Sequence, residues 1–262
     1  MPGREMRVRS AVECPGGKGV NAARALRSLG VPAGLLTLTD ILDVPPRVNT
    51  TVRDRAGHSF RLLEPGPRLS AQQWHQVEAA VLKAARQVDQ VVLSGSLPPG
   101  VPEDAYARII RASGCAFLDT SGAALARGVK AAPFCVKPNR EEAQALLGMT
   151  IRSRAAVRKA LRSLAGYGIK RVLLSLGEDG LAGTDGQEYV RASVPCRRGS
   201  TVGCGDAALA GFLAGRRNGG SFAEALLFAA AAGAANVAVQ VPGDILPGLV
   251  KQLMKKVVIE RL

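Results

Sequence analysis

The residues of this chain best suited to chemistry form a glycine-rich turn, Gly199-Ser-Thr-Val-Gly-Cys-Gly-Asp206, followed at once by a small apolar run at 207–214. The run predicts a helix, and the N–H groups and dipole at a helix N-terminus bind anions such as phosphate. In isolation, Asp206 is most simply a helix cap. The alternative is that the N–H groups hold a transferring phosphoryl group while Asp206 accepts the proton of the attacking hydroxyl.

Two common nucleotide-binding motifs do not explain this turn. The spacing of Gly203, Gly205 and Ala208 fits the dinucleotide fingerprint, but that fingerprint requires a strand after its helix. Here residues 218–221 form a turn, and the chain beyond them is typical of another helix. The chain also contains no G-x-x-x-x-G-K-[ST] sequence, which excludes a P-loop.

Composition predicts a globular protein without a membrane anchor. The chain has 262 residues, of which 47% are hydrophobic, enough for the core of one large α/β domain. Its first residues, 1–13, are charged rather than apolar, and the longest apolar run, 225–239, is shorter than the roughly 20 residues of a membrane span. The five cysteines lack metal-binding spacing, so we expect reduced thiols and a cytoplasmic protein.

The net charge of +14 would permit nucleic-acid binding. The basic residues are dispersed, however, and aromatic residues make up only 4% of the chain, too few for a base-stacking platform. A nucleic-acid-binding protein is therefore the least favoured interpretation, and anionic small-molecule substrates explain part of the charge.

The elements that must position the turn follow an α/β pattern. Short β-branched runs alternate with helical patterns from about residue 79, which predicts a mostly parallel sheet covered by helices. The predicted strands are 90–94, 116–119, 134–137 and 172–176, and the predicted helices are 21–29, 71–87, 102–113, 140–147, 153–167, 206–216 and 222–240. Residues 44–63 predict a β hairpin with its turn at 54–57, a candidate lid. Nothing divides the chain, so we predict one domain over 1–262.

Polar or glycine-rich turns follow the predicted strands in order, and in an open α/β sheet ligands bind beyond the carboxyl ends of the strands. A further such turn opens the first helix. The five turns are Cys14-Pro-Gly-Gly-Lys-Gly-Val-Asn21, Ser94-Gly-Ser-Leu-Pro-Pro-Gly100, Asp119-Thr-Ser-Gly122, Lys137-Pro-Asn-Arg-Glu-Glu142 and Leu176-Gly-Glu-Asp-Gly180.

In this order the turns resemble the PfkB (ribokinase-like) carbohydrate kinase family, over about residues 9–243. The Gly16-Gly-Lys-Gly-Val-Asn21 turn is similar to the family's first signature, and the turn ending at Asp206 is similar to its second. The Ser94 and Lys137 turns, with Glu64-Pro-Gly-Pro67, resemble the 1-phosphofructokinases and tagatose-6-phosphate kinases. The resemblance implies a ribokinase-like three-layer α/β sandwich, with a mostly parallel central sheet and a small β lid.

The resemblance also assigns roles in phosphoryl transfer from ATP with Mg²⁺. Asp206 would be the general base, and Gly203, Cys204 and Gly205 would form an anion hole around the γ-phosphate, which matches the positioning and charge stabilisation that this reaction needs. The acceptor would be a ketohexose phosphate, first fructose 1-phosphate and second tagatose 6-phosphate.

On the nucleotide side, Asn139 and Glu142 match the family's N-x-x-E motif, implicated in placing Mg²⁺, through water because Mg²⁺ keeps its hydration shell. The alternative for this pair is a helix cap of the capping-box type. Ser175, Gly177 and Thr201 would lie along the nucleotide.

The segment 232–236, ending at Asn236, would flank the adenine, although core packing explains that helical stretch equally well. On the acceptor side, Gly17, Lys18 and Asn21 would contact sugar hydroxyls. Arg47 would bind the phosphate of the sugar through its fork of donors, or is a solvated surface charge.

The chain departs from the family pattern in its N-terminal half. Family members usually begin with a strand ending in Asn-Pro-x-x-Asp, whose aspartate contacts substrate, and this chain has no such sequence. After Asp40 it also omits a glycine pair, a helix and a strand. An abridged active kinase is the favoured explanation because the nucleotide half is intact. The alternatives are a truncated reading frame and a non-catalytic relative that binds nucleotide or sugar phosphate. The family often dimerises through its lid, so the resemblance allows a homodimer.

Overall fold

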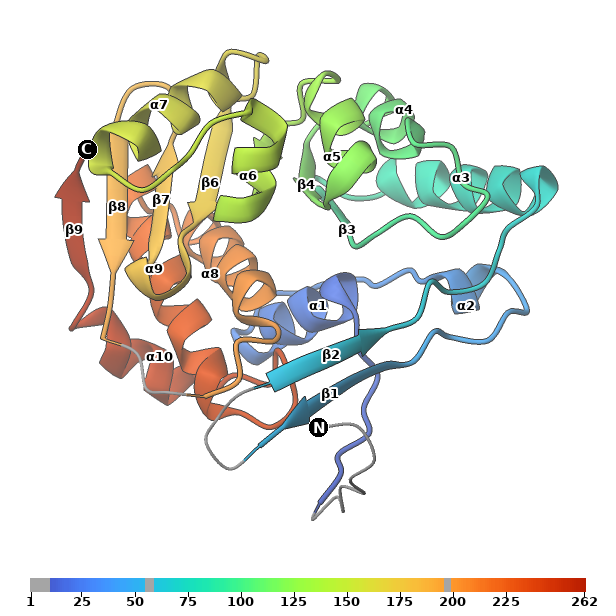
Figure 1. Cartoon of the computed structure of the whole chain (residues 1–262), viewed down its shortest axis with the longest axis horizontal. Coiled ribbons are helices and arrows are strands. Elements are labelled where there is room, and N and C mark those ends of the chain that lie inside the picture. Colours follow the sequence, from blue (N-terminus) through green and yellow to red (C-terminus); the bar gives the residue numbers. More distant parts are fainter. Residues whose placement is uncertain (1–9, 55–58, 196–198) are drawn as a thin grey trace, which may run out of the picture.

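A mixed β-sheet forms the centre of the computed structural model, which describes residues 10–54, 59–195 and 199–262 (Figure 1). Within these residues the sheet has seven strands in the order β3-β4-β5-β6-β7-β8-β9. Their bounds are β3 (Val91–Ser94), β4 (Ala116–Asp119), β5 (Cys135–Val136), β6 (Arg171–Ser175), β7 (Leu181–Thr184), β8 (Tyr189–Ser193) and β9 (Val258–Arg261).

Five of the seven described strands run in the same direction, as the prediction of a mostly parallel sheet requires. Strands β3 to β6 pair in parallel, and β7, β8 and β9 each pair antiparallel with the strand before them. Strand β8 therefore runs in the same direction as β3 to β6. The sequence prediction missed β7 to β9, and β3 is an edge strand of the described sheet.

Helices cover both faces of the sheet, which makes the three layers of the predicted sandwich (Figure 1). One face packs against α1 (Lys18–Ser28), α8 (Cys204–Arg217), α9 (Phe222–Ala235) and α10 (Pro247–Met254). The other packs against α3 (Ala71–Ala85), α4 (Ala105–Ala112), α5 (Gly122–Val129), α6 (Arg140–Leu147) and α7 (Arg154–Ala165). Alternation along the strands divides the core: Phe117 faces the first group and Leu118 the second.

Three helix predictions differ from the structure in a way that bears on the site. Helix α1 begins at Lys18 rather than at residue 21, and α8 begins at Cys204 rather than at 206. Both helices start directly after a glycine with positive φ, Gly17 and Gly203, so the glycine sets the start. Helix α9 ends at Ala235, and a short 3₁₀ turn, η2 (Asn236–Ala238), replaces its predicted last turn. The short α2 (Leu38–Ile41), α5 and α10 were not predicted.

The predicted hairpin forms a separate two-stranded antiparallel sheet of β1 (Asn49–Arg53) and β2 (Ser59–Leu63). Every residue of the two strands is exposed except Val52, which is half-buried. The hairpin prediction is therefore confirmed for its strands. Most of the predicted turn, 55–57, and the predicted strand start at His58 lie outside the described residues.

Across the described ranges, every helix is too short or too polar to cross a bilayer.

Candidate active site

The site lies where the carboxyl ends of β3, β4 and β5 meet the N-termini of α1 and α8. Helix α8 can begin there because its cap, Gly203, has a φ of 81°, which strongly favours glycine. The helix continues through ten consecutive buried residues, from Asp206 to Gly215, most of them alanine or glycine. These small side chains let α8 pack closely against α9, and that packing fixes its N-terminus beside the sheet.

Asp206 is buried at the head of α8, with 6% of its surface exposed. Its Oδ2 accepts a hydrogen bond of 2.8 Å from Nδ2 of Asn21 in α1. Burial raises the pKa of Asp206 to about 6, and the charge of Asp119 adds to the rise, while the Asn21 hydrogen bond, Lys137 and Lys18 oppose it. A carboxylate with that pKa is mostly ionised at neutral pH and takes up a proton readily, as a general base must.

Three charged side chains, those of Lys18, Asp119 and Lys137, lie next to Asp206. The ammonium groups of Lys18 and Lys137 lie 2.8 and 3.0 Å from the two oxygens of Asp119, which is 1% exposed. Burial alone would raise the pKa of Asp119, but the two ammonium groups outweigh it and hold that pKa below its ordinary value. The Lys18 ammonium also lies 3.7 Å from Glu142 Oε1. The structure thus joins Lys18 and Glu142, which were predicted on opposite sides of the site.

Lys137 reaches the turn predicted to bind phosphate. A Cβ atom added to Gly205 would lie 3.1 Å from Lys137 Nζ, so the ammonium group lies close to the backbone of this turn. The N–H of Cys204 donates to the carbonyl of Thr201 at 3.2 Å. The next two N–H groups, those of Gly205 and Asp206, belong to the first turn of α8, where backbone donors lack intrahelical acceptors. They and the Lys137 ammonium form one positively polarised surface next to Asp206.

Asn139 and Glu142 form the capping box that was the alternative to their metal role. Asn139 Oδ1 accepts from the Glu142 N–H and Glu142 Oε2 accepts from the Asn139 N–H, both at 2.8 Å. The carboxylate still presents its second oxygen, Oε1, toward Lys18. Asn139 also pairs with Ser175 in an isolated parallel bridge, which brings the N-x-x-E turn beside the end of β6 and the following Gly177.

Asn236 does not face an open space. It is fully buried, and its amide bonds to Val202 O, to Cys204 Sγ and to the N–H of Gly243. Its side-chain amide is hydrogen-bonded within the protein, and the predicted contact between the segment 232–236 and the adenine stays a prediction.

Arg47 lies apart from these charged side chains, at the base of the lid. Its Nη1 donates to Ser96 Oγ at 2.8 Å, and with Glu64 and Gly66 it lines a pocket of about 230 Å³. Ser96 belongs to the turn after β3, whose Gly95 N–H donates to Asp119 O at 3.0 Å. The guanidinium is exposed, and its hydrogen bond fastens it to a loop that adjoins the site. Its role in binding a phosphate stays a prediction, beside the alternative of a solvated surface charge.

Two residues of the site, Asp119 and Lys137, were not among those predicted. Each stands at the carboxyl end of a predicted strand, in a turn already recognised as part of the pattern. A charged residue directly after a buried strand is the signal that could have identified them, since such a residue is buried only with a partner. Neither turn contains its own partner, so the pairing was invisible without the fold.

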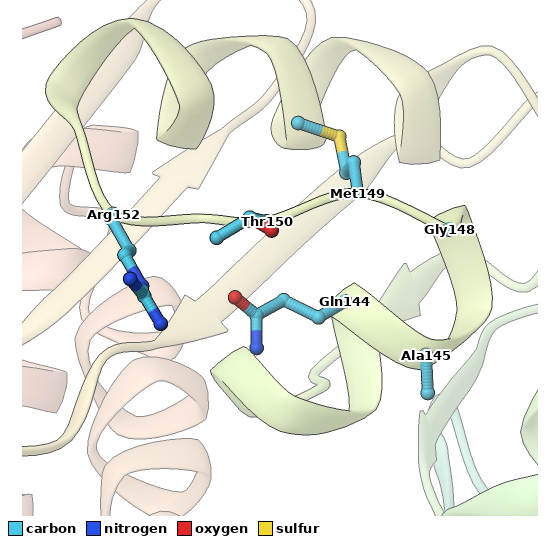
Figure 2. Close-up of a pocket in the computed structure, with 6 residues that line it drawn as sticks. All are labelled: Gln144, Ala145, Gly148, Met149, Thr150 and Arg152. Carbon is cyan, nitrogen blue, oxygen red and sulfur yellow. The ribbon is translucent and has the colours of Figure 1, made fainter.

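A surface pocket of about 430 Å³ lies elsewhere, between α6 and the segment that leads into α7 (Figure 2). Figure 2 shows Gln144 and Arg152 reaching toward one another across it. Gln144 Oε1 accepts from the Ile151 N–H at 2.8 Å and ties the segment to α6. The pocket is lined by Gln144, Ala145, Gly148, Met149, Thr150 and Arg152, none of which was predicted for the site.

Comparisons with known proteins find relatives of this chain among carbohydrate kinases. The sequence profile described as "pfkB family carbohydrate kinase" matches residues 43–248. The 1-phosphofructokinase of Haemophilus influenzae is 31% identical, over 84% of this chain and 79% of that protein, and the D-tagatose-1-phosphate kinase of Klebsiella oxytoca is 30% identical, over 87% and 83%. Phosphofructokinase-2 of Escherichia coli, solved in complex with potassium, superposes with a TM-score of 0.83 at 29% identity, covering 97% of this chain and 92% of that one.

Proposed function

The chain belongs to the pfkB family of carbohydrate kinases, and we propose that it transfers the γ-phosphoryl group of ATP to a hydroxyl of a ketohexose phosphate. Fructose 1-phosphate is the first candidate acceptor and tagatose 6-phosphate the second. The observation that carries the proposal is the buried Asp206 carboxylate, held by Asn21 at the head of α8 and beside the Lys137 ammonium.

Asp206 accepts the proton of the acceptor hydroxyl as that oxygen attacks the γ-phosphorus. Its Oδ2 already accepts the hydrogen bond from Asn21, which favours Oδ1 as the oxygen that takes the proton. The raised pKa makes the carboxylate a stronger base than an exposed aspartate, while leaving it ionised at pH 7.

The phosphoryl group is bound by donors that are already in place. The Gly205 N–H, the dipole of the 14-residue helix α8 and the Lys137 ammonium point toward the same region. The Lys137 ammonium is already paired with the Asp119 carboxylate at 3.0 Å. Its position therefore needs little rearrangement as negative charge develops on the oxygens of the transferring phosphoryl group.

Asn21 also has the means to orient the acceptor. Among the described residues its Oδ1 is buried and accepts no hydrogen bond, while its Nδ2 donates to Asp206. A sugar hydroxyl next to the attacking one that donates to this oxygen would hold the acceptor beside the base. Arg47, at the base of the lid, would take the phosphate already on the sugar, where a forked guanidinium suits phosphate oxygens.

The residues present fit a Mg²⁺ ion bound mainly by the nucleotide. No cluster of three or more candidate ligands occurs in the part of the chain that the structure describes. The Glu142 Oε1 oxygen, which the capping box leaves available, would hold the hydrated ion through water. When bound, Mg²⁺ supplies charge neutralisation to the phosphates.

We further propose that a second copy of the chain covers the lid. Residues that pair across the hairpin share a face, so Thr50, Val52, Phe60 and Leu62 form one apolar surface. Phe60 and Leu62 are 48% and 59% exposed, which is costly unless another molecule covers them. Light scattering should give a dimer for the wild type and a monomer for Leu62→Glu. A wild-type monomer would exclude this arrangement.

The kinase proposal is tested by coupled measurement of ADP release over ketohexose 1-phosphates and 6-phosphates, with Asp206→Asn as the matched control. Turnover by the wild type with at least one acceptor, and loss of most turnover in Asp206→Asn with ATP binding retained, is the expected result. Thermal stabilisation by ATP without ADP release from any acceptor would instead indicate a non-catalytic nucleotide-binding protein.

A further inference from the structure

The tight turn Pro242-Gly243 lies between Asn21 of α1 and Gly203, the cap of α8. A Cβ atom at Gly243 would lie 2.3 Å from the carbonyl oxygen of Asn21, and one at Gly203 would lie 2.7 Å from Pro242 Cβ. Arg24 of α1 donates to the Pro242 carbonyl and fastens the same turn from the other side. The turn thus touches both the cap of the phosphate-binding helix and the residue that holds the base.

The side chain of Asn236 holds this turn in place. It is 0% exposed, and its Oδ1 accepts from the Gly243 N–H at 2.7 Å. Its Nδ2 donates to Val202 O at 2.8 Å and approaches Cys204 Sγ at 3.5 Å. An amide has an acceptor at one end and donors at the other, and this geometry uses both ends. The buried amide therefore joins the phosphate-binding turn to the Pro242-Gly243 turn.

We propose that Asn236 is a positioning residue: by clamping Gly243 against Asn21 and Val202 against α8, it sets the hydrogen bond between Asn21 and the base Asp206. The inference rests on the proposed function for the role of Asp206, and it gives the Asn236 side chain a role other than the adenine contact predicted from the sequence. Its physical basis is the close contact between Gly243 and the Asn21 backbone. Because no space separates them, a shift of the Pro242-Gly243 turn moves Asn21.

Loss of the hydrogen bonds of the Asn236 side chain should change the pKa of Asp206 as well as kcat. The groups that face Asp206 are Asp119 from β4, Lys137 after β5, and Lys18 and Asn21 from α1. The Asn21 hydrogen bond lowers the pKa of Asp206, against the effects of burial and of Asp119. Weakening that bond therefore moves the pKa of Asp206 further above its present value of about 6.

The test uses Asn236→Leu, which keeps the approximate volume and removes the polar ends. Gly243→Ala is the second variant, because it displaces Asn21 from the other side of the same contact. Asn218→Leu, at an exposed position at the far end of α8, is the control. Carbon-13 NMR titration of the Asp206 carboxyl in the ligand-free proteins reports its pKa without turnover, so the test stands even if the wild type proves inactive.

We expect both variants to raise the Asp206 pKa and to move the acidic limb of the rate profile upward with it. At pH 7 kcat should fall by about 10- to 100-fold, the cost of roughly 1 Å of misplacement, while KM for ATP stays within about twofold. The control should match the wild type. An unchanged Asp206 pKa in a folded variant would overturn the proposal. An increase in KM for ATP at constant kcat would also overturn it and restore the nucleotide contact.

Discussion

Replacing Asp206 by asparagine should stabilise the protein while it abolishes most turnover. The carboxylate is buried, and its pKa is raised from 3.8 to about 6, so the folded state opposes its ionisation. A group whose pKa is raised by folding contributes stability at low pH and loses it as pH rises through the folded pKa. Asparagine keeps the hydrogen bond from Asn21 but carries no charge, and it avoids this loss.

The size of the effect follows from the shift. A change of about 2 pKa units at 1.36 kcal/mol per unit gives about 3 kcal/mol, reached above pH 7. At pH 5 the same linkage gives roughly half, because most of the wild-type Asp206 is then protonated in the folded state while the unfolded state is still mostly ionised. For a domain of this size, about 3 kcal/mol corresponds to an increase in Tm of roughly 6 to 12 °C.

Urea unfolding of the wild type and Asp206→Asn at pH 7.5 and pH 5 checks both the sign and the pH dependence. Asp43→Asn, at an exposed carboxylate, is the matched control and should change the free energy of unfolding by less than about 0.5 kcal/mol. If Asp206→Asn is no more stable than the wild type at pH 7.5, or if its gain is the same at both pH values, burial does not dominate the energetics of Asp206 and the reasoning fails.

Four further outcomes can be measured. The kcat/KM of the wild type should fall about tenfold per pH unit below about pH 6, since Asp206 must be ionised; a flat profile contradicts its role as base. Asn21→Ala should move that limb to higher pH, because a hydrogen bond that lowers the Asp206 pKa is lost. Lys137→Met leaves Asp119 short of a buried counter-charge and should cost roughly 3 to 5 kcal/mol in urea unfolding. Arg47→Ala should raise KM for the sugar phosphate about 10- to 100-fold with KM for ATP unchanged; equal changes in both would refute the assigned role.

Much of the fold could be predicted because its signals are local. The strand at 116–119 and the helix at 140–147 match β4 and α6 to the residue, since each has a sharp boundary in the sequence: a polar turn after the strand, and the Asn139 cap before the helix. The antiparallel β7 to β9 and the short α5 were missed. These elements are short, and their place in the fold depends on packing against α9 and β4 rather than on their own pattern.

Parts of the site could be predicted because chain order and residue type carry them: a glycine turn before an apolar helix predicts a helix N-terminus, and its order among the other turns predicts the phosphate-binding role. The sequence by itself determined that turn, the order of the motifs and the family that they indicate. Only the tertiary structure decided what Asp206 can do. Its partner Asn21 lies 185 residues away, and the pair of Lys18 with Asp119 spans 101. The raised pKa of Asp206 and the hydrogen bonds of Asn236 arise from burial and from contact between distant segments. A local sequence pattern cannot predict either.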